Sequence, residues 1–152
     1  MNKVLLATAM ISVAVAALAQ DAMRMARVTP DEVKWFSPSS LPKGAELAFL
    51  SGDPTKAELV VERLKLPPNY QLPAHTHPYD EVITILSGSE RLGFGDKVDP
   101  SVSLGKPGTL YMNPAKNPHH AAAGPEGAII QVQFVGPSKI DYINPTDDPR
   151  KK

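Results

Sequence analysis

Residues 75–81 read H-T-H-P-Y-D-E, and this stretch holds two of the four histidines in the 152-residue chain. Side chains two positions apart in a β-strand lie on one face, so His75 and His77 are predicted to point together into the space that a sheet encloses. Pro78 ends the regular ladder and permits a bend, after which Glu81 returns to the same face. Two imidazoles and a carboxylate form a ligand set that suits a divalent first-row metal and leaves coordination positions open.

Cysteine is absent from the chain, so no disulfide and no thiolate ligand or nucleophile is available. Any metal must therefore be held by His, Asp or Glu. The second pair of histidines lies at positions 119 and 120. His119 is the natural candidate for a further ligand. No catalytic acid or base is evident, because Asp80 adjoins Glu81 and is expected to point away from it.

The remaining sequence favours an all-β domain. Sixteen prolines and ten glycines divide it into segments that are too short for most helices. The spacing suits an antiparallel sandwich or barrel. A short helix is expected within residues 20–34, with Pro30 in its first turn. The expected strands cover residues 45–50, 58–66, 82–86, 91–95, 101–104, 109–112, 120–123 and 128–135.

The histidine-rich stretch resembles the first motif of the cupins, a family of small antiparallel β-barrels. That motif is usually written G-x5-H-x-H-x3,4-E-x6-G. His75, His77, Glu81 and Gly88 match it at the required spacing. Asn69 stands at the leading glycine and is a residue type that also tolerates left-handed turn geometry.

A second stretch resembles the other cupin motif, G-x5-P-x-G-x2-H-x3-N. Gly108, Pro114 and His119 match it. Two positions depart from it, since Lys116 stands where the second glycine is expected and Ala123 replaces the final asparagine. Neither departure removes a ligand.

The resemblance implies a fold class and a domain organisation. The implied fold is a single small antiparallel cupin (jelly-roll) β-barrel over residues 45–135. A short N-terminal extension covers residues 20–44, and an irregular C-terminal tail covers residues 136–152. The chain is also similar to a group of exported single-domain cupins whose tail reads I-x-Y-x-N-P-x-D-D-P-R, matched here by residues 140–150.

The resemblance also implies one divalent transition metal, which is Mn, Fe, Zn, Ni or Cu. The implied ligands are His75, His77, Glu81 and His119. His120 is then expected on the opposite face of its strand, as a surface or packing residue.

Four further residues are candidates for a pocket beside the metal. Gln131 and Gln133 alternate with apolar neighbours, so one face of the last long strand carries amides. These amides would orient a ligand or a metal-bound water if they face the barrel mouth, and a solvent-facing polar stripe is the alternative. Tyr111 and Arg63 would meet an anionic or oxygenated substrate, with surface placement as the alternative.

Residues 1–19 are predicted to be a secretory signal peptide. Lys3 precedes an apolar run over residues 4–18, and the run ends in Ala17-Leu18-Ala19, a small-x-small cleavage site. The alternative, a retained membrane anchor, needs about 20 apolar residues and this run is shorter. The mature protein is therefore expected to be exported, periplasmic or secreted, with no stable membrane anchor.

Charge and composition limit the classes of binding partner that we expect. Lys and Arg together number 16, as do Asp and Glu, and no basic stripe with interleaved aromatics is present, so nucleic acid is not an expected partner. A small molecule is the expected ligand or substrate. We expect a homodimer formed through edge strands or through an exchanged N-terminal segment.

The leading functional hypothesis is a metal-binding cupin that acts on a small oxygenated molecule by oxygenase or other redox chemistry. In that case the protein is a metal-dependent oxidoreductase. The alternative is a non-enzymatic barrel that binds a metal or a small ligand. A structural barrel without metal follows if His119 does not reach the site.

Overall fold

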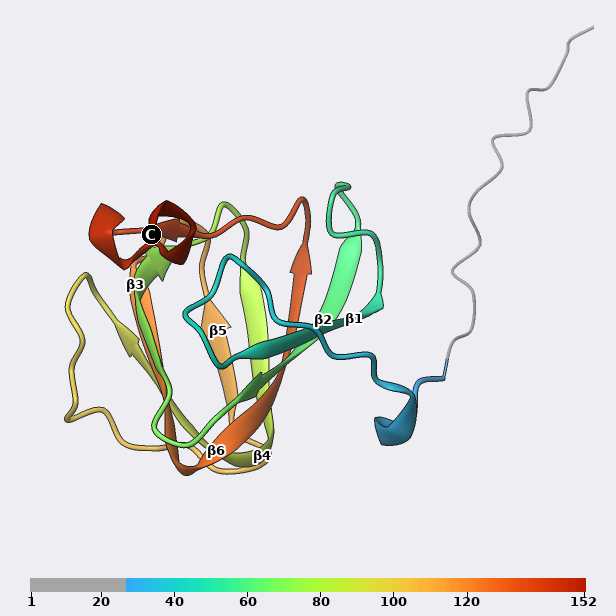
Figure 1. Cartoon of the computed structure of the whole chain (residues 1–152), viewed down its shortest axis with the longest axis horizontal. Coiled ribbons are helices and arrows are strands. Elements are labelled where there is room, and N and C mark those ends of the chain that lie inside the picture. Colours follow the sequence, from blue (N-terminus) through green and yellow to red (C-terminus); the bar gives the residue numbers. More distant parts are fainter. Residues whose placement is uncertain (1–26) are drawn as a thin grey trace, which may run out of the picture.

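The computed structural model describes residues 27–152, and the expected signal peptide lies outside this range. Within this range no helix is long and apolar enough to cross a membrane. The chain forms an antiparallel β structure with a few single-turn helices (Figure 1). The strands are β1 (Glu46–Ser51), β2 (Leu59–Leu66), β3 (Gln71–Thr76), β4 (Glu81–Phe94), β5 (Leu110–Asn113), β6 (His119–Val135) and β7 (Asp141–Tyr142), and the 3-10 helices are η1 (Pro30–Glu32), η2 (Pro145–Asp147) and η3 (Pro149–Lys151).

Two long strands, β4 and β6, form the central pair of the fold. They pair antiparallel from Val82 opposite Gln133 to Phe94 opposite His119, with register shifts midway. Both strands bend at this midpoint, where Gly88 has a φ of +71°. A Cβ at Gly88 would lie 2.0 Å from the carbonyl oxygen of Gly127, so only glycine fits the bend.

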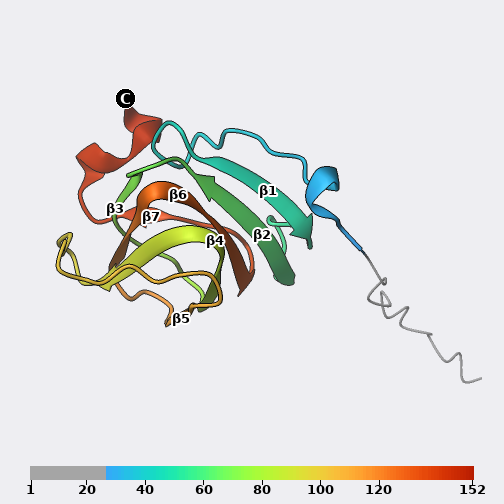
Figure 2. The ribbon, with the colours of Figure 1, turned by 90° about the horizontal axis from the view of Figure 1, so that it is seen from below.

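The other strands extend this bent pair into one sheet that wraps around a core. β2 pairs with the C-terminal half of β6, β3 pairs with its N-terminal half, and β5 pairs with the start of β4. β1 and β7 pair with β2 and β3 at the two ends of the sheet, which is not closed by hydrogen bonds. Seen from below, β1 and β2 lie on one side of the molecule and β4 and β5 on the other (Figure 2). The sheet is thus an unclosed antiparallel barrel.

The core lies inside this wrapped sheet and is built by strand alternation. On β2 every second side chain is buried, and the same alternation marks the second half of β6. Large aliphatic groups and one phenylalanine fill the interior, among them Val60, Leu64, Ile83, Ile85, Leu92, Ile130, Val132 and Phe134. The all-β, antiparallel, barrel-like fold expected from the sequence is confirmed.

Several expected elements differ from the observed ones. The breaks between the expected strands, at residues 87–90 and 124–127, lie inside β4 and β6, because glycine lets a strand bend while its neighbours stay paired. Residues 101–104 form no strand, and the only bridge pairing beside them is between Glu90 on β4 and Gly105, within the part of the chain that the structure describes. The expected helix within residues 20–34 is reduced, in the described part of the chain, to η1.

Strand β3 was absent from the expected set, although it carries His75. Pro73 lies inside it, where a proline argues against a paired strand. The ladder between β3 and β6 shifts register between Leu72 and His75, so the strand passes Pro73 as an irregularity.

The C-terminal segment packs against the barrel instead of forming a loose tail. β7 pairs with β3, Ile140 is buried, and the Tyr142 hydroxyl donates to the Ser40 carbonyl at 2.8 Å. Asp148 is buried as well and binds Arg150, which also donates to the Ile140 carbonyl at 3.1 Å. The expectation of an irregular tail is therefore corrected: the segment packs against its own barrel.

Candidate metal centre

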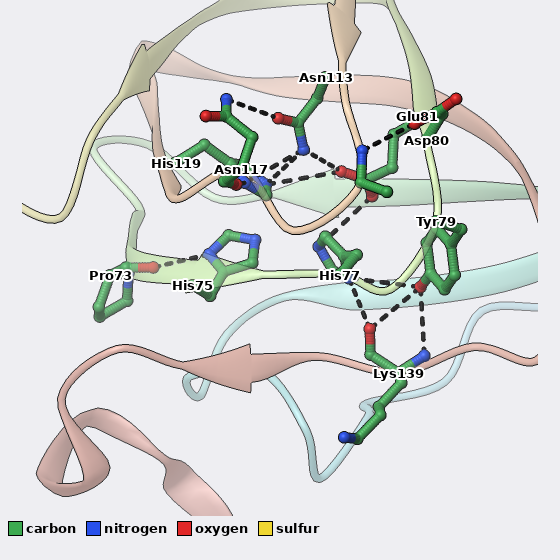
Figure 3. Close-up of polar contacts among 11 residues, drawn as sticks. Pro73, His75, His77, Tyr79, Asp80, Glu81, Asn113, Asn117, His119 and Lys139 are labelled. Atoms are coloured by element: carbon green, nitrogen blue, oxygen red, sulfur yellow. Dashed lines mark hydrogen bonds and ion pairs between the residues drawn. The ribbon is translucent and has the colours of Figure 1, made fainter.

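Three histidines meet inside the barrel near one end (Figure 3). His75 on β3 lies opposite His119, the first residue of β6, and their ring centroids are 4.1 Å apart. His77 follows β3, and its ring centroid lies 4.9 Å from that of His75 and 5.3 Å from that of His119. One ligand atom from each histidine lies within 4.8 Å of the others. These three side chains are positioned to hold a metal ion.

Each of the three rings is held by a backbone carbonyl at its Nδ1 atom. His75 Nδ1 lies 2.7 Å from the Pro73 oxygen, His77 Nδ1 lies 2.6 Å from the Lys139 oxygen, and His119 Nδ1 lies 3.0 Å from the Asn117 oxygen. A carbonyl only accepts hydrogen bonds, so it fixes the proton on Nδ1 and leaves Nε2 with a free lone pair. This is the tautomer that a metal ligand requires.

The carboxylate of Glu81, the first residue of β4, lies beside two of these rings. Its oxygens are 3.4 Å from His77 Nε2 and 3.5 Å from His119 Nε2. Its Oε2 also accepts a 2.8 Å hydrogen bond from the amide of Asn113, which is almost completely buried. Three of the side chains that the sequence singled out as metal ligands, those of His75, His77 and His119, are thus positioned to hold a metal ion, and the fourth, Glu81, lies beside two of them.

Asn113 is a residue of this site that the sequence did not reveal. Its amide nitrogen also lies 3.1 Å from His119 Nδ1, and its oxygen accepts a 3.3 Å hydrogen bond from Asn117. The only signal in the sequence is its place directly before Pro114 in the second motif, and no rule of spacing identifies a buried asparagine there.

The buried position of the site sets the charge of its groups. Burial, together with the neighbouring His119 and His77 rings, lowers the pKa of His75 to about 2. Burial also lowers the pKa of His77 and of His119. The imidazoles are thus neutral at neutral pH, as metal binding requires. Burial raises the pKa of Glu81, an effect that the Asn113 hydrogen bond opposes, and a bound dication would favour the carboxylate further.

Two loop contacts hold the histidine-rich stretch against the loop before β6. The Ala115 N–H donates to Asp80 at 2.7 Å, so Asp80 points away from Glu81 as expected, and the Lys116 N–H donates to the His77 carbonyl at 2.7 Å. Lys116 has a φ of +61° and Asn69 has a φ of +58°. The two positions where the family motifs carry glycine thus keep the left-handed backbone, although neither residue is glycine.

Tyr79 packs between His77 and the C-terminal segment. Its ring stacks on Phe134 with centroids 4.3 Å apart, and it also stacks on His77. Its hydroxyl donates to the Lys139 carbonyl and accepts from the Lys139 N–H, both at 3.2 Å. The ring of His77 is therefore held by residues on both sides of it.

The three histidines and Glu81 line one part of a cavity of about 80 Å³ inside the barrel. Most of its wall is apolar, and its lining includes Tyr79 and aliphatic side chains of the core. Two carboxyl groups, Glu62 on β2 and Glu90 on β4, also line it. The sequence did not single them out, although Glu62 alternates with Val60 and Leu64, a pattern that places it on the inner face.

None of the four residues expected in the pocket lines this cavity. Gln131 and Gln133 alternate with inward-facing neighbours on β6, so they lie on the outer face of the sheet, where the Arg63 guanidinium donates to Gln131 at 3.2 Å. Tyr111 packs against the core, and its hydroxyl donates to the Glu90 backbone carbonyl at 3.0 Å. Alternation alone does not say which face of an isolated strand is the inner one, and this accounts for the difference.

His120 lies on the face of β6 opposite the site and is fully buried. Its Nε2 accepts a 3.0 Å hydrogen bond from the Asp99 N–H. The segment after β4 therefore covers it, and it serves as a packing residue outside the cluster of the other three histidines.

No known family model and no curated protein matches the chain. Solved structures do. The polyketide cyclase RemF from Streptomyces resistomycificus has a TM-score of 0.65 at 22% identity over 84% of this chain and 92% of RemF. An RmlC-like cupin from Shewanella frigidimarina NCIMB 400 has a TM-score of 0.58 at 16% identity over 74% of this chain and 90% of that protein. The DMSP lyase DddQ from Ruegeria pomeroyi DSS-3 has a TM-score of 0.61 at 17% identity over 76% of this chain and 63% of the lyase. The cupin fold is thereby confirmed.

Proposed function

We propose that the protein is a metal-dependent cupin that acts on a small oxygenated molecule, with oxygenase or other redox chemistry as its reaction class. The observation that carries this proposal is the set of three Nδ1-held histidines whose Nε2 atoms converge beside Glu81 at the wall of a cavity. His75, His77, Glu81 and His119 would hold the metal. When bound, it would supply Lewis acidity and open positions for a chelating substrate and dioxygen.

The residues around this site would orient the ligands and exclude water. The backbone carbonyls of Pro73, Lys139 and Asn117 keep the imidazoles in the ligating tautomer. Asn113 holds the Glu81 carboxylate in place. The aliphatic wall of the cavity limits water around a bound molecule.

A non-enzymatic barrel that binds a metal or a small ligand is the competing proposal. It would need only the ligands and the cavity, whereas a reaction with proton transfer needs an acid or base that is not a ligand. Glu62 and Glu90 are two such groups at the cavity wall, and they favour the enzyme. The structural neighbours are named as a cyclase and a lyase among others, so the fold by itself does not select the reaction.

The first experiment is elemental analysis of the purified protein from residue 20 onward, beside the His75→Ala/His77→Ala and His120→Ala variants. Near-stoichiometric transition metal is expected in the parent and in His120→Ala, and almost none in the double variant. Equal loss in both variants would contradict the ligand assignment. Oxygen uptake with a panel of small diketones and hydroxyketones then tests the reaction class, and metal binding without turnover would support the binding barrel.

Export and association are further parts of the proposal. The apolar segment at residues 4–18 supports cleavage after Ala19 and an exported, periplasmic or secreted location. N-terminal sequencing of the mature protein tests the cleavage site. Homodimer formation is tested by light scattering during gel filtration, where a monomer mass would contradict it.

A further inference from the structure

Glu62 and Glu90 are buried carboxyl groups that the proposed metal site does not use. Glu62 is 9% exposed and Glu90 is 1% exposed, and the Oε2 atom of each has no hydrogen-bond partner. Both line the same cavity as the three histidines, one from β2 and the other from β4. A buried polar atom without a partner is costly, so two of them at one cavity wall indicate a function.

The charges around these two groups show which form they take. Within residues 27–152 neither carboxyl forms an ion pair, and the cavity-lining Lys139 directs its ammonium group to Asp141 at 2.8 Å. Neither belongs to the group of side chains that could hold a metal in that part of the chain. Burial and, secondarily, the charge of Glu81 raise the pKa of both groups to about 8. They are therefore carboxylic acids at neutral pH, and each offers an O–H donor.

The rest of the wall indicates what these donors meet. Leu64, Leu72, Leu92, Ile130 and Val132 are among the residues that line the cavity, and such a surface favours a hydrocarbon body. Acid groups that donate hydrogen bonds require acceptors, which are oxygen atoms in a molecule of this kind.

We propose that Glu62 and Glu90 bind, as carboxylic acids, the oxygen atoms of an uncharged and mainly apolar small molecule that also reaches the metal site. This inference rests on the proposed function and names its ligand class. The opposite arrangement, two carboxylates that bind an ammonium group, would favour a cationic ligand and is an outcome of the test.

The first arm of the test needs no ligand. Infrared difference spectra at neutral pH, in water and in heavy water, detect the carbonyl stretch of protonated carboxyl groups. We expect this band in the parent protein, a partial loss in Glu62→Gln and in Glu90→Gln, and no change in Glu126→Gln, which alters an exposed carboxyl. A parent protein without the band, or an unchanged band in both buried variants, would overturn the proposal.

The second arm measures ligand charge by calorimetry on the metal-loaded protein. Acetoin, an uncharged hydroxyketone, and isopropanolamine, which carries an ammonium group, serve as matched small probes. Tighter binding of acetoin is expected, and Glu62→Leu or Glu90→Leu should weaken it about tenfold, the worth of one hydrogen bond. The Gln variants keep an N–H donor, so they should retain most of the affinity. Preference for isopropanolamine, or no binding of either probe, would overturn the ligand class.

Failure of this inference and failure of the proposed function give different results. Glu62 and Glu90 are not ligands, so their Gln variants should keep the metal content of the parent. A parent protein without metal would contradict the proposed function, while the infrared arm, repeated on metal-free protein, still decides whether the two acids are protonated.

Discussion

Asn113 and Glu81 face each other across the pair of strands β5 and β4, and the asparagine amide donates a 2.8 Å hydrogen bond to the Glu81 carboxylate. Both side chains are buried, so no water replaces this donor when it is removed. This hydrogen bond links the second motif to the first. It does so through Asn113, which is not one of the proposed metal ligands.

Replacement of Asn113 by leucine, which has a similar size and no donor, is therefore expected to weaken metal binding about 10- to 100-fold, the usual cost of losing a group that orients a ligand. Competition with a metal chelator measures the affinity. Asn117→Ala is the control, because within residues 27–152 its side chain forms a hydrogen bond only with Asn113, and its backbone carbonyl, which holds His119, stays in place. Equal losses in the two variants would contradict a specific role for Asn113.

The stability of the metal-free protein should be greatest in mildly acidic solution. His75 has a folded pKa of about 2 against an ordinary value of 6.5, so the unfolded chain binds more protons below pH 6.5 and stability falls on acidification. Glu62 and Glu90 have folded pKa values of about 8 against 4.5, so stability falls as the pH rises from 4.5 through 8. The melting temperature is thus expected to peak between pH 4.5 and 6.5.

The Glu62→Gln/Glu90→Gln variant provides the control for this pH dependence. It removes both groups that bind protons in the folded state, so its melting temperature should decline less steeply on the alkaline side. A decline as steep as that of the parent would show that other groups cause it.

Gly93 leaves the space that the buried His120 ring fills. A Cβ at Gly93 would lie 2.2 Å from His120 Cε1, and the ring has no free room because it is fully buried. Gly93→Ala should destabilise the protein by about 1 to 3 kcal/mol, the usual cost of overpacking. The measurement is the free energy of unfolding in urea.

A double variant tests whether this contact is the cause. In Gly93→Ala/His120→Ala the added methyl group has the space of the missing ring, so the two changes together should cost less than the sum of their separate effects. Additive costs would mean that Gly93 is needed for another reason.

Lys116 adopts the left-handed conformation at an exposed turn, with a φ of +61°. Side chains with a Cβ are disfavoured there, so Lys116→Gly is expected to stabilise the protein by about 1 kcal/mol. Chemical denaturation measures the change. Lys106→Gly, at another exposed lysine that does not have a positive φ, should instead be neutral or destabilising. Stabilisation by both variants would contradict the conformational explanation.

The sequence predicted the site better than it predicted the strands around it. His75, His77, Glu81 and His119 were singled out by residue type, by spacing and by resemblance to the cupin motifs. His75 and His119 meet because β3 and β6 lie side by side. β3 itself was missed because Pro73 interrupts its pattern. The local sequence preference argues against a strand at Pro73. Pairing with residues that are distant in the chain overrides this preference, and a local pattern does not contain that information.

The cavity wall was harder to predict for a related reason. Period-two alternation separates Gln131 from Ile130, yet only the assembled sheet shows that Ile130 lines the cavity and that Gln131 meets Arg63 outside. Glu62 and Glu90 were overlooked because charged residues are rarely buried, and a strand pattern with one acid on its inner face looks like an exposed edge.

The hydrogen bond between His77 and the Lys139 carbonyl joins residues that are 62 positions apart in the chain. It has a consequence for the order of folding events. Loops of this length close slowly, and pairs with large sequence separation form late. The site is complete only after those pairs exist, so a metal ion would be captured by a nearly native barrel. Its main kinetic effect would be to slow unfolding, with little change in the rate at which the chain folds.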